Sequence, residues 1–403
     1  MADGEMDAPP SLFYLCGVVY GVGGSTWFTT IGFLDEAVAD DLKEARALRG
    51  IVPACFYLGM ACGAAALGTV SDIRCGRRNV VLLSMALSAL ASLLAAAMPS
   101  VYGVAAATLF VGAGVGGCLP VASALLAESN SLAVAARRRW VTMLGAFFGA
   151  GAIPVALADG AILSHGRAVV DIAPWRSMLV LLGAFELLVV VPFLACFLPE
   201  SEQWSDEREE AVAARGGAEE ERAVREVPLI DKRDRAGGTV ARAATTTICA
   251  RSLRVKTALL WCCWFGFNFS TSGVTAFLPL LLDGGRAAAG GASPGAEWQQ
   301  QAQSVATYSI AAVVGVVLAS LLVNWRAGRR VVLCVCMLLT AVCTALFAWP
   351  RAGALALLLF GCASSLLSNV AWASLSLATV EVSVLLCTVT YYANRAYSLT
   401  RSP

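Results

Sequence analysis

The residues able to do chemistry in this sequence are charged side chains confined to short gaps between long apolar segments. The stretch GTVSDIRCGRR, residues 68–78, places one acid, three arginines and two glycines in one such gap. Arginines at the edge of a membrane can anchor a helix or pair with an acid. The sequence contains no recognisable nucleophile with its base, phosphate loop or metal-ligand cluster. We therefore expect electrostatic rather than catalytic chemistry, with no enzyme activity, no cofactor and no metal.

Composition indicates a membrane protein. Of 403 residues, 58% are hydrophobic and 14% are charged, and the mean hydropathy is +0.72. The net charge of +1 leaves no basic stripe for nucleic acid. The fourteen cysteines fall mostly inside apolar segments and are interpreted as free packing thiols.

Ten apolar segments reach or approach the roughly 20 residues that cross a bilayer as a helix. They lie at 11–32, 51–70, 79–98, 101–127, 140–161, 177–198, 256–282, 303–323, 331–349 and 353–378. The chain is predicted to comprise a cytosolic tail (1–10), a six-helix bundle (11–198), a charged cytosolic linker (199–255) and an incomplete second bundle (256–403).

Basic residues predict the orientation, because Lys and Arg are retained on the cytoplasmic side. Arginine clusters lie in alternate gaps, at 74–78, 137–139 and 326–330, with more in the linker. We therefore expect a multi-pass integral membrane protein with a cytoplasmic N-terminus. The sequence does not indicate which membrane holds it.

The charged gap recurs in degenerate form 252 residues further on, as SLLVNWRAGRR between two later apolar segments. Two glutamates at nearly the same offset, Glu128 and Glu381, each follow the fourth apolar segment of their half. The chain is thus predicted to contain two homologous helical units, the architecture of many secondary transporters.

The first gap resembles the G-x-x-x-D-R-x-G-R-R loop of the major facilitator superfamily, apart from a shift that puts Ile73 before Arg74. LFVGAGVGGCLPVASALLAE, PWRSMLVLLG, LPES and LLWCCWFGFNFSTSG are most similar to the branch of synaptic-vesicle-protein-related and organic-ion or sugar-porter-like carriers. The resemblance implies an all-α fold of two six-helix repeats, the second incomplete. Past Glu381 the resemblance is lost, so we expect a truncated or frame-shifted C-terminus that lacks most of helix 11 and helix 12.

The resemblance also implies that the charged gap is a conformational latch, with Asp72 near the start of helix 11. Membrane anchoring alone would explain the arginines but not an acid and two glycines at fixed spacing. The expected latch residues are Gly68, Asp72, Arg74, Gly76, Arg77, Arg78, Gly328, Arg329 and Arg330.

Polar side chains recur at helical spacing in the apolar segments 256–282 and 353–378. The family fold would place these two segments, together with helices 1 and 4, around a central cavity. The alternative is that small polar residues only allow close helix packing or bond to their own carbonyls. The cavity candidates are Thr26, Thr108, Asn268, Thr271, Ser272, Thr275, Ser365, Ser368, Asn369 and Trp372.

Charge is absent from the expected cavity, since Gly23 and Thr26 stand where the resembling branch often has an acidic residue or pair, and Thr108 stands where it often has an arginine. Intramembrane charges usually mark ion handling, so facilitated diffusion is favoured over proton coupling. Glu186, alone in an apolar segment, is interpreted as structural, with a coupling role as the alternative. Asp159 is expected to reach the outer interface. A candidate charge relay comprises Glu128, Arg137, Glu186 and Glu381.

The sequence therefore predicts a secondary carrier of a small organic solute that works by alternating access. A transport-inactive receptor or scaffold of the same fold is the alternative. The expected partners are the solute and the lipid bilayer, without nucleic acid and without a required oligomer.

Overall fold

The computed structural model describes residues 11–42, 50–129, 134–165, 172–202, 294–322, 329–347 and 359–376, with a few isolated positions between them. The chain divides into two compact units, Met1–Trp204 with Val274–Ala373, and Ser205–Gly273 with Ser374–Pro403. The described helices belong almost entirely to the first unit. Most of the span expected at 256–282 and nearly all of the expected linker lie outside the described residues.

Helices account for the regular structure of the described ranges. In chain order they are α1 (Ser11–Val18), η1 (Val19–Ser25), α2 (Thr26–Asp41), α3 (Ile51–Val70), η3 (Ser71–Cys75), α4 (Arg77–Ala97), α5 (Val101–Ala127), α6 (Val134–His165), α7 (Pro174–Phe185), η5 (Glu186–Val190), α8 (Val191–Phe197), α13 (Pro294–Leu322) and α14 (Arg329–Phe347). A further helix occupies 359–376. Six helical stretches in this part of the chain are long and apolar enough to cross a membrane.

Helices α3 and α5 have the bounds expected from the sequence, whereas three other spans are longer, among them α13, which begins at Pro294 instead of near residue 303. The first span continues through α1, η1 and α2 to Asp41 instead of ending near residue 32. Helix α6 begins at Val134 and ends at His165, beyond the expected 140–161. Arginines and a histidine near its ends can lie at the headgroup level while the backbone stays helical, so hydropathy alone underestimates its length.

Reciprocal glycine contacts hold α3 against α5. A Cβ on Gly59 or Gly63 would lie 1.9 Å from the Leu109 carbonyl oxygen or 2.0 Å from that of Ala113. In return, Cβ atoms on Gly112 and Gly116 of α5 would strike the backbone of α3. Small residues are needed here because helices in lipid associate through close backbone packing rather than a hydrophobic driving force.

Two spans contain π-helical turns in their interior, in addition to the turn η3 at the end of α3. In the sixth span, Val191 donates its backbone N–H to the Glu186 carbonyl five residues back. Pro192 follows, and it has no N–H with which to continue the regular i to i−4 ladder. The first span has its π-helical turns at η1, where Gly21 and Gly151 of α6 meet closely enough that a Cβ on Gly151 would lie 2.4 Å from the Gly21 carbonyl oxygen. Such turns occur often at functional sites.

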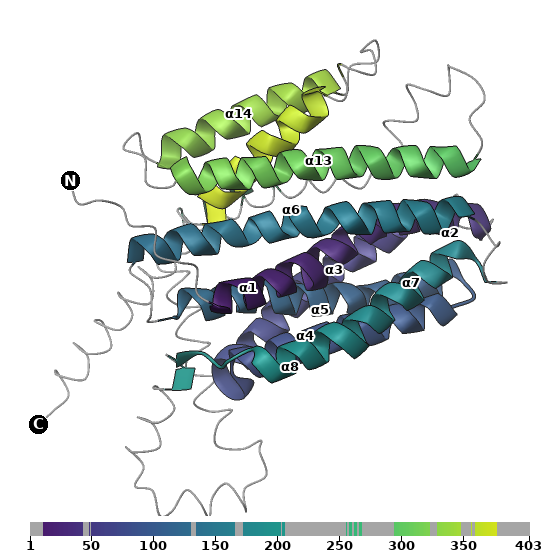
Figure 1. Cartoon of the computed structure of the whole chain (residues 1–403), viewed down its shortest axis with the longest axis horizontal. Helices are drawn as coiled ribbons and strands as arrows, with labels where there is room; N and C mark the ends of the chain where they lie inside the picture. The colour runs from purple at the N-terminus through teal and green to yellow at the C-terminus, as the bar shows by residue number, and fades with distance from the viewer. Residues whose placement is uncertain are drawn as a thin grey trace, which may run out of the picture. The chain divides into compact units, whose positions relative to one another are not determined.

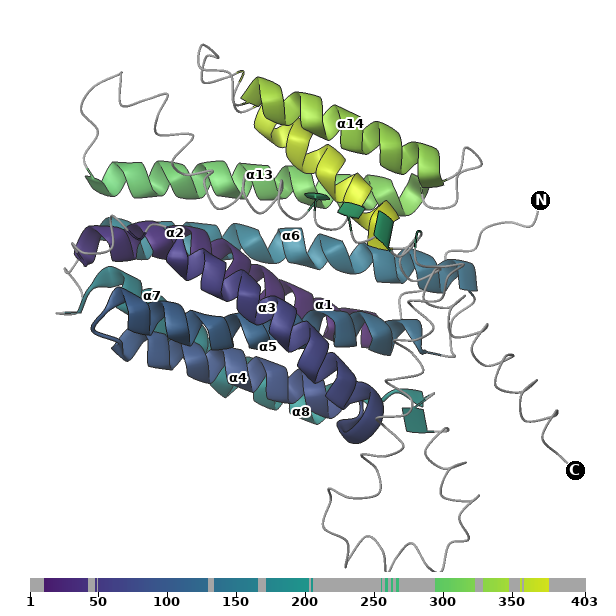
Figure 2. The same cartoon turned by 180° about the vertical axis from the view of Figure 1, so that it is seen from behind.

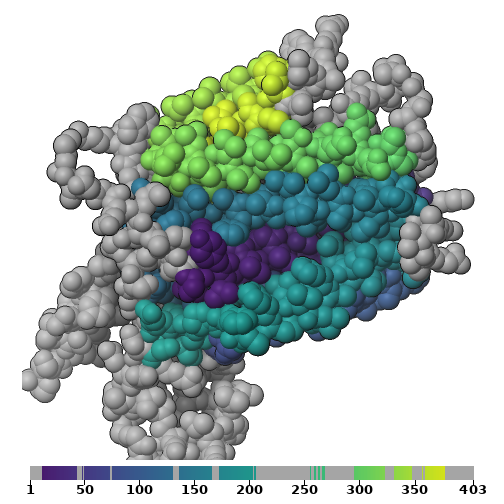
Figure 3. Space-filling model, viewed as in Figure 1, coloured from purple at the N-terminus to yellow at the C-terminus, as the bar shows by residue number. Residues whose placement is uncertain are grey.

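Helix α13 packs along α6, so helices from the two halves of the sequence lie side by side (Figures 1 and 2). A Cβ on Gly149 would lie 2.8 Å from Val313 Cγ2, and one on Gly160 would lie 2.3 Å from Ala302 Cβ. The space-filling view shows the side chains of α6 and α13 meeting along their length (Figure 3). Beyond α13, Ser365 of helix 359–376 donates to the Tyr308 carbonyl at 2.8 Å.

Large apolar side chains remain on the outside of the helices. Leu188, Leu321 and Leu338 are 71%, 66% and 69% exposed. Such surfaces suit hydrocarbon better than water, which agrees with a membrane-spanning bundle.

Candidate functional site

The charged loop between α3 and α4 forms an ion-pair cluster with the end of α5. The Arg77 guanidinium donates to Glu128 through Nη2 at 2.7 Å and through Nε at 3.1 Å. Arg77 Nη1 pairs with Asp72 and also donates to Ser71 Oγ at 3.2 Å. The side chain of Arg77 is 15% exposed and that of Glu128 is 18% exposed, whereas Asp72 is 65% exposed. One guanidinium thus links the turn η3 to the C-terminal end of α5.

A carboxylate from the end of the sixth span caps α4. Glu200 Oε1 accepts backbone N–H groups of Arg77 at 2.7 Å and of Arg78 at 3.1 Å. These donors are among the unpaired N–H groups at a helix N-terminus, where the helix dipole also favours a negative charge. Gly76, at φ +78°, precedes them, and a Cβ there would lie 2.4 Å from Glu200 Oε2. Gly76 is therefore required both by its backbone angle and by the approach of the carboxylate.

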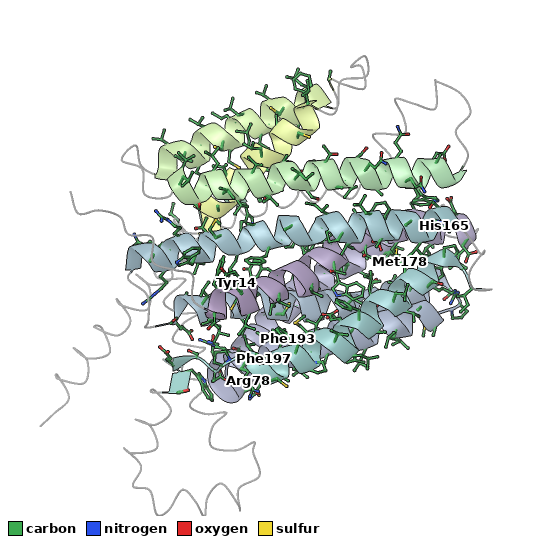
Figure 4. The ribbon with its side chains drawn as sticks, in the orientation of Figure 1. Tyr14, Arg78, His165, Met178, Phe193 and Phe197 are labelled. Atoms are coloured by element: carbon green, nitrogen blue, oxygen red, sulfur yellow. The ribbon has the colours of Figure 1, made fainter. Side chains whose placement is uncertain are left out.

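Further bonds join the same cluster to the sixth span. Ser201 donates its hydroxyl to Glu128, and Arg78 Nη2 donates to the Ala195 carbonyl of α8. The labelled side chains place Arg78 beside Phe197 at one end of the helices, with His165 at the other end (Figure 4). The cluster therefore connects the third, fourth and sixth spans at one end of the bundle.

For several expected latch residues the structure describes no side-chain contact or does not describe the residue. A Cβ on Gly68 would meet no described atom within 4 Å. The backbone of Arg74 lies in η3, and Arg329 and Arg330 begin α14, but their side chains are outside the described set. Gly328 lies outside the described residues, as does the expected partner of Asp72 in helix 11.

The expected charge relay is not brought together by the described residues. Glu128 belongs to the Arg77 cluster, and Glu186 lies in the interior of the sixth span with 1% exposure. Arg137 is half-buried near the start of α6. Glu381 lies outside the described residues.

Thr26 and Thr108 are buried and bond within their own spans. Thr26 donates to the Gly21 carbonyl at 3.4 Å, and Thr108 to the Ala105 carbonyl at 2.9 Å. The same pattern holds for part of helix 359–376, where Ser368 and Asn369 both donate to the Ser365 carbonyl. Hydroxyl groups satisfied in this way need no solute partner.

Trp372 of the same helix reaches α6. A Cβ on Gly145 would lie 3.1 Å from Trp372 Cζ3 and 3.2 Å from Val316 Cγ2 of α13. This glycine thus makes room for an aromatic side chain from the second half of the sequence. The four cavity candidates of the seventh span, Asn268, Thr271, Ser272 and Thr275, lie outside the described residues.

Two buried carboxyl groups accept hydrogen bonds from side chains of α2. Glu186 accepts Trp27 Nε1–H at 2.8 Å on Oε2 and contacts Ser88 Oγ at 2.9 Å with Oε1. Asp159 accepts the Thr30 hydroxyl at 2.8 Å on Oδ2. Asp159 is 0% exposed, so the expectation that it reaches the outer interface is wrong: it points inward to α2. Glu186 is likewise not surrounded by apolar groups alone.

Sequence reasoning missed four of these residues as site members: Glu200, Ser201, Trp27 and Ser88. Glu200 and Ser201 stand in the LPES segment, whose polar letters directly after an apolar span were a usable signal. Trp27 and Ser88 lie 159 and 98 residues from Glu186, and neither type stands out within a membrane segment. Only the packing of the spans reveals them.

A bundle of apolar helices with buried polar side chains and a charged cluster at one end defines an integral membrane protein of the transporter type. Residues 14–390 match the family model described as "Major Facilitator Superfamily". The chain belongs to this superfamily, whose members are transporters and not enzymes.

Two curated proteins illustrate the similarity. A niacin transporter, NiaP, of Acinetobacter baylyi is 26% identical over 253 residues, which are 62% of this chain and 55% of that protein. Solute carrier family 22 member 12 of Rattus norvegicus is 28% identical over 274 residues, 64% of this chain and 45% of that protein. The chain therefore matches about half the length of these relatives.

Solved structures share the fold. The xylose transporter XylE of E. coli, in a partially occluded inward-open conformation, has a TM-score of 0.62 at 18% identity, over 94% of this chain and 89% of that one. The human organic anion transporter MFSD10 has a TM-score of 0.55 at 18% identity, over 92% of this chain and 85% of that one. At this identity the likeness concerns the fold alone.

Proposed function

We propose that this chain carries a small organic solute across a membrane by alternating access between its two sets of helices, with its N-terminus in the cytoplasm. The main support is the family match over residues 14–390. The relatives are named as a transporter of niacin and as a solute carrier, which indicates small organic molecules as the substrate class. The arginine clusters in alternate gaps support the orientation.

The transport mode is facilitative in this proposal. Thr26 and Thr108 bring no charge to the expected cavity, and both hydroxyls bond within their own spans. These two positions therefore offer no charged group with which to bind a driving ion. The solute gradient alone then drives net movement, and no obligatory oligomer is required.

The Arg77 cluster supplies the gate at the cytoplasmic end. It joins three spans through one guanidinium and one capping carboxylate, so these spans move together when that end opens. Asp72 is mostly exposed and remains available to a further partner, as the latch proposal requires. Gly328, Arg329 and Arg330 are the corresponding elements of the second repeat.

Uptake into proteoliposomes tests the proposal. Purified protein is reconstituted, and entry of labelled nicotinate, xylose and a panel of small organic anions is measured against protein-free vesicles. We expect saturable uptake of at least one solute that is unaffected by an imposed pH gradient. Uptake that rises only with an inward proton gradient would contradict the facilitative mode and leave the carrier assignment intact.

A transport-inactive receptor or scaffold is the second candidate. It is favoured by the neutral Thr26 and Thr108 and by the local bonding of Ser368 and Asn369. Asn369→Cys, in a background without exposed native cysteines, distinguishes the two. A solute that slows maleimide labelling of this thiol and is also taken up supports the carrier, whereas protection without uptake supports the receptor. Labelling unaffected by any solute supports the scaffold.

A further inference from the structure

The hydroxyl group of Ser88 lies within hydrogen-bond distance of two oxygen atoms but has only one hydrogen to donate. Its hydroxyl oxygen lies 2.8 Å from the Met85 carbonyl oxygen and 2.9 Å from Glu186 Oε1. Both neighbours are acceptors if Glu186 is ionised, yet a serine hydroxyl carries one hydrogen. A carboxylate would therefore leave one of these two short oxygen contacts without a proton between them.

A proton on Glu186 removes the conflict. Glu186 Oε1–H then donates to Ser88 Oγ, and Ser88 Oγ–H donates to the Met85 carbonyl. Trp27 Nε1–H donates to the other oxygen, Oε2, at 2.8 Å. Each donor then has one acceptor, and the chain of bonds is of the kind in which neighbours strengthen one another.

We propose that Glu186 is a proton-binding site that joins the first, third and sixth spans. Glu186 and Ser88 are each 1% exposed, so bulk solvent does not reach them to donate the missing hydrogen bond. A metal cation would need about six oxygen ligands for sodium-like or calcium-like coordination, and the described contacts of this carboxyl are one indole and one hydroxyl. A proton is the ligand that fits without a cavity.

The surroundings of Glu186 hold few other ionisable groups. On α5, the Cys118 thiol lies close enough to interact electrostatically with Glu186. On η1, Tyr20 is buried in the same apolar cluster as Cys118. Two arginines of the packed helices are engaged elsewhere: Arg77 with Glu128 and Arg176 with the Ala96 carbonyl.

Three carboxyl groups on α2 and α6 also have described donors of their own. Asp41 of α2 accepts the Trp175 indole N–H of α7, and Asp35 accepts the Gly50 backbone N–H. Asp159 of α6 accepts from Thr30, three residues after Trp27 on α2. Among the described contacts of Glu186 there is thus no cation to hold it ionised.

The position of the site gives the proton a structural consequence. Glu186 begins η5, and Trp27 follows η1, so the carboxyl joins the two spans that contain π-helical turns in their interior. Without this proton, Ser88 could keep its hydrogen bond with only one of two partners, the Met85 carbonyl or the Glu186 carboxylate. The proton therefore keeps all three spans bonded at once, whether or not the chain transports a solute.

Infrared spectroscopy of the full chain in lipid at neutral pH tests the proposal. The infrared difference spectrum between wild type and Glu186→Gln must contain the band of the removed group, which is either a carboxylic acid C=O stretch or a carboxylate stretch. We expect loss of the carboxylic acid band, and Asp159→Asn as the control should retain that band component. Loss of a carboxylate band in Glu186→Gln, with no change in the acid region, would overturn the proposal.

A second variant decides the matter should Glu186→Gln fail to fold. In Ser88→Ala the neutral carboxyl loses the acceptor of its O–H, so the carboxylic acid C=O stretch should shift. A shift confined to the carboxylate region would show that Glu186 is ionised. Neither reading depends on uptake, so failure of the transport proposal and failure of this one are distinguishable.

Discussion

Substitution of Gly63 by alanine should weaken the bundle at the crossing of α3 and α5. A Cβ at this position would lie 2.0 Å from the Ala113 carbonyl oxygen and 2.6 Å from the Ala113 carbonyl carbon. Ordinary contact begins near 3.4 Å, so the two helices must separate locally by about 1.4 Å. The atoms in the way are backbone, which cannot rotate aside as a flexible side chain can.

The expected cost follows from this displacement. Overpacking of a close-packed interior typically costs about 1 to 3 kcal/mol, because neighbouring atoms lose contact when the helices move apart. The contact is also reciprocal, since Gly112 and Gly116 of α5 meet α3 at similarly short distances. We therefore expect a cost near the upper end of that range for Gly63→Ala.

Thermal denaturation in detergent measures the effect, and the same helix offers a control. Gly68→Ala meets no described atom within 4 Å, so it should be neutral or stabilise α3 by about 0.4 to 1 kcal/mol. The predicted order of apparent melting temperature is Gly68→Ala at or above wild type, with Gly63→Ala several degrees below. Equal melting of the two variants, or a more stable Gly63→Ala, would refute the packing argument.

Other predictions concern the polar contacts. Glu200→Ala should destabilise the protein by about 0.5 to 2 kcal/mol, measured by thermal denaturation, because α4 loses its cap. Arg77→Lys and Glu128→Gln should each slow solute exchange, and the double variant should be no slower than the worse single one, since both break one pair; additive losses would contradict this. Trp27→Phe should cost about 1 to 3 kcal/mol of stability because a buried Glu186 oxygen loses its donor. Thr108→Val should leave stability nearly unchanged, and a changed KM for uptake would place Thr108 on the solute path.

The apolar pattern predicts the membrane fold because lipid imposes a simple rule on the backbone. Spans such as Ile51–Val70 and Val101–Ala127 are apolar runs bounded by polar or turn-forming residues, and their ends coincide with the expected ones. The ends of α6 are less visible, because Arg137 to Arg139 can lie at the headgroup level inside a continuing helix. Hydropathy measures polarity, whereas the helix ends where its hydrogen bonds end.

The polar contacts are harder to predict because they join residues far apart in the chain. The Gly76, Arg77 and Arg78 stretch signals a charged loop, but its capping carboxylate, Glu200, lies 123 residues from Arg77. Glu186 is conspicuous in an apolar span, yet its donors are an ordinary tryptophan and serine on other helices. Spacing identifies such a group as unusual, and only the packing identifies its partners.

Counterflow tests the central claim, alternating access, most directly. Proteoliposomes loaded with a high concentration of unlabelled solute, chosen from nicotinate, xylose and the organic anion panel, are diluted into a trace of the labelled compound. Alternating access predicts a transient accumulation of label above equilibrium for at least one solute, reduced in Arg77→Lys, because a carrier exposes its site to one side at a time. Label that only equilibrates, or that enters no faster than in protein-free vesicles for every solute, would contradict it.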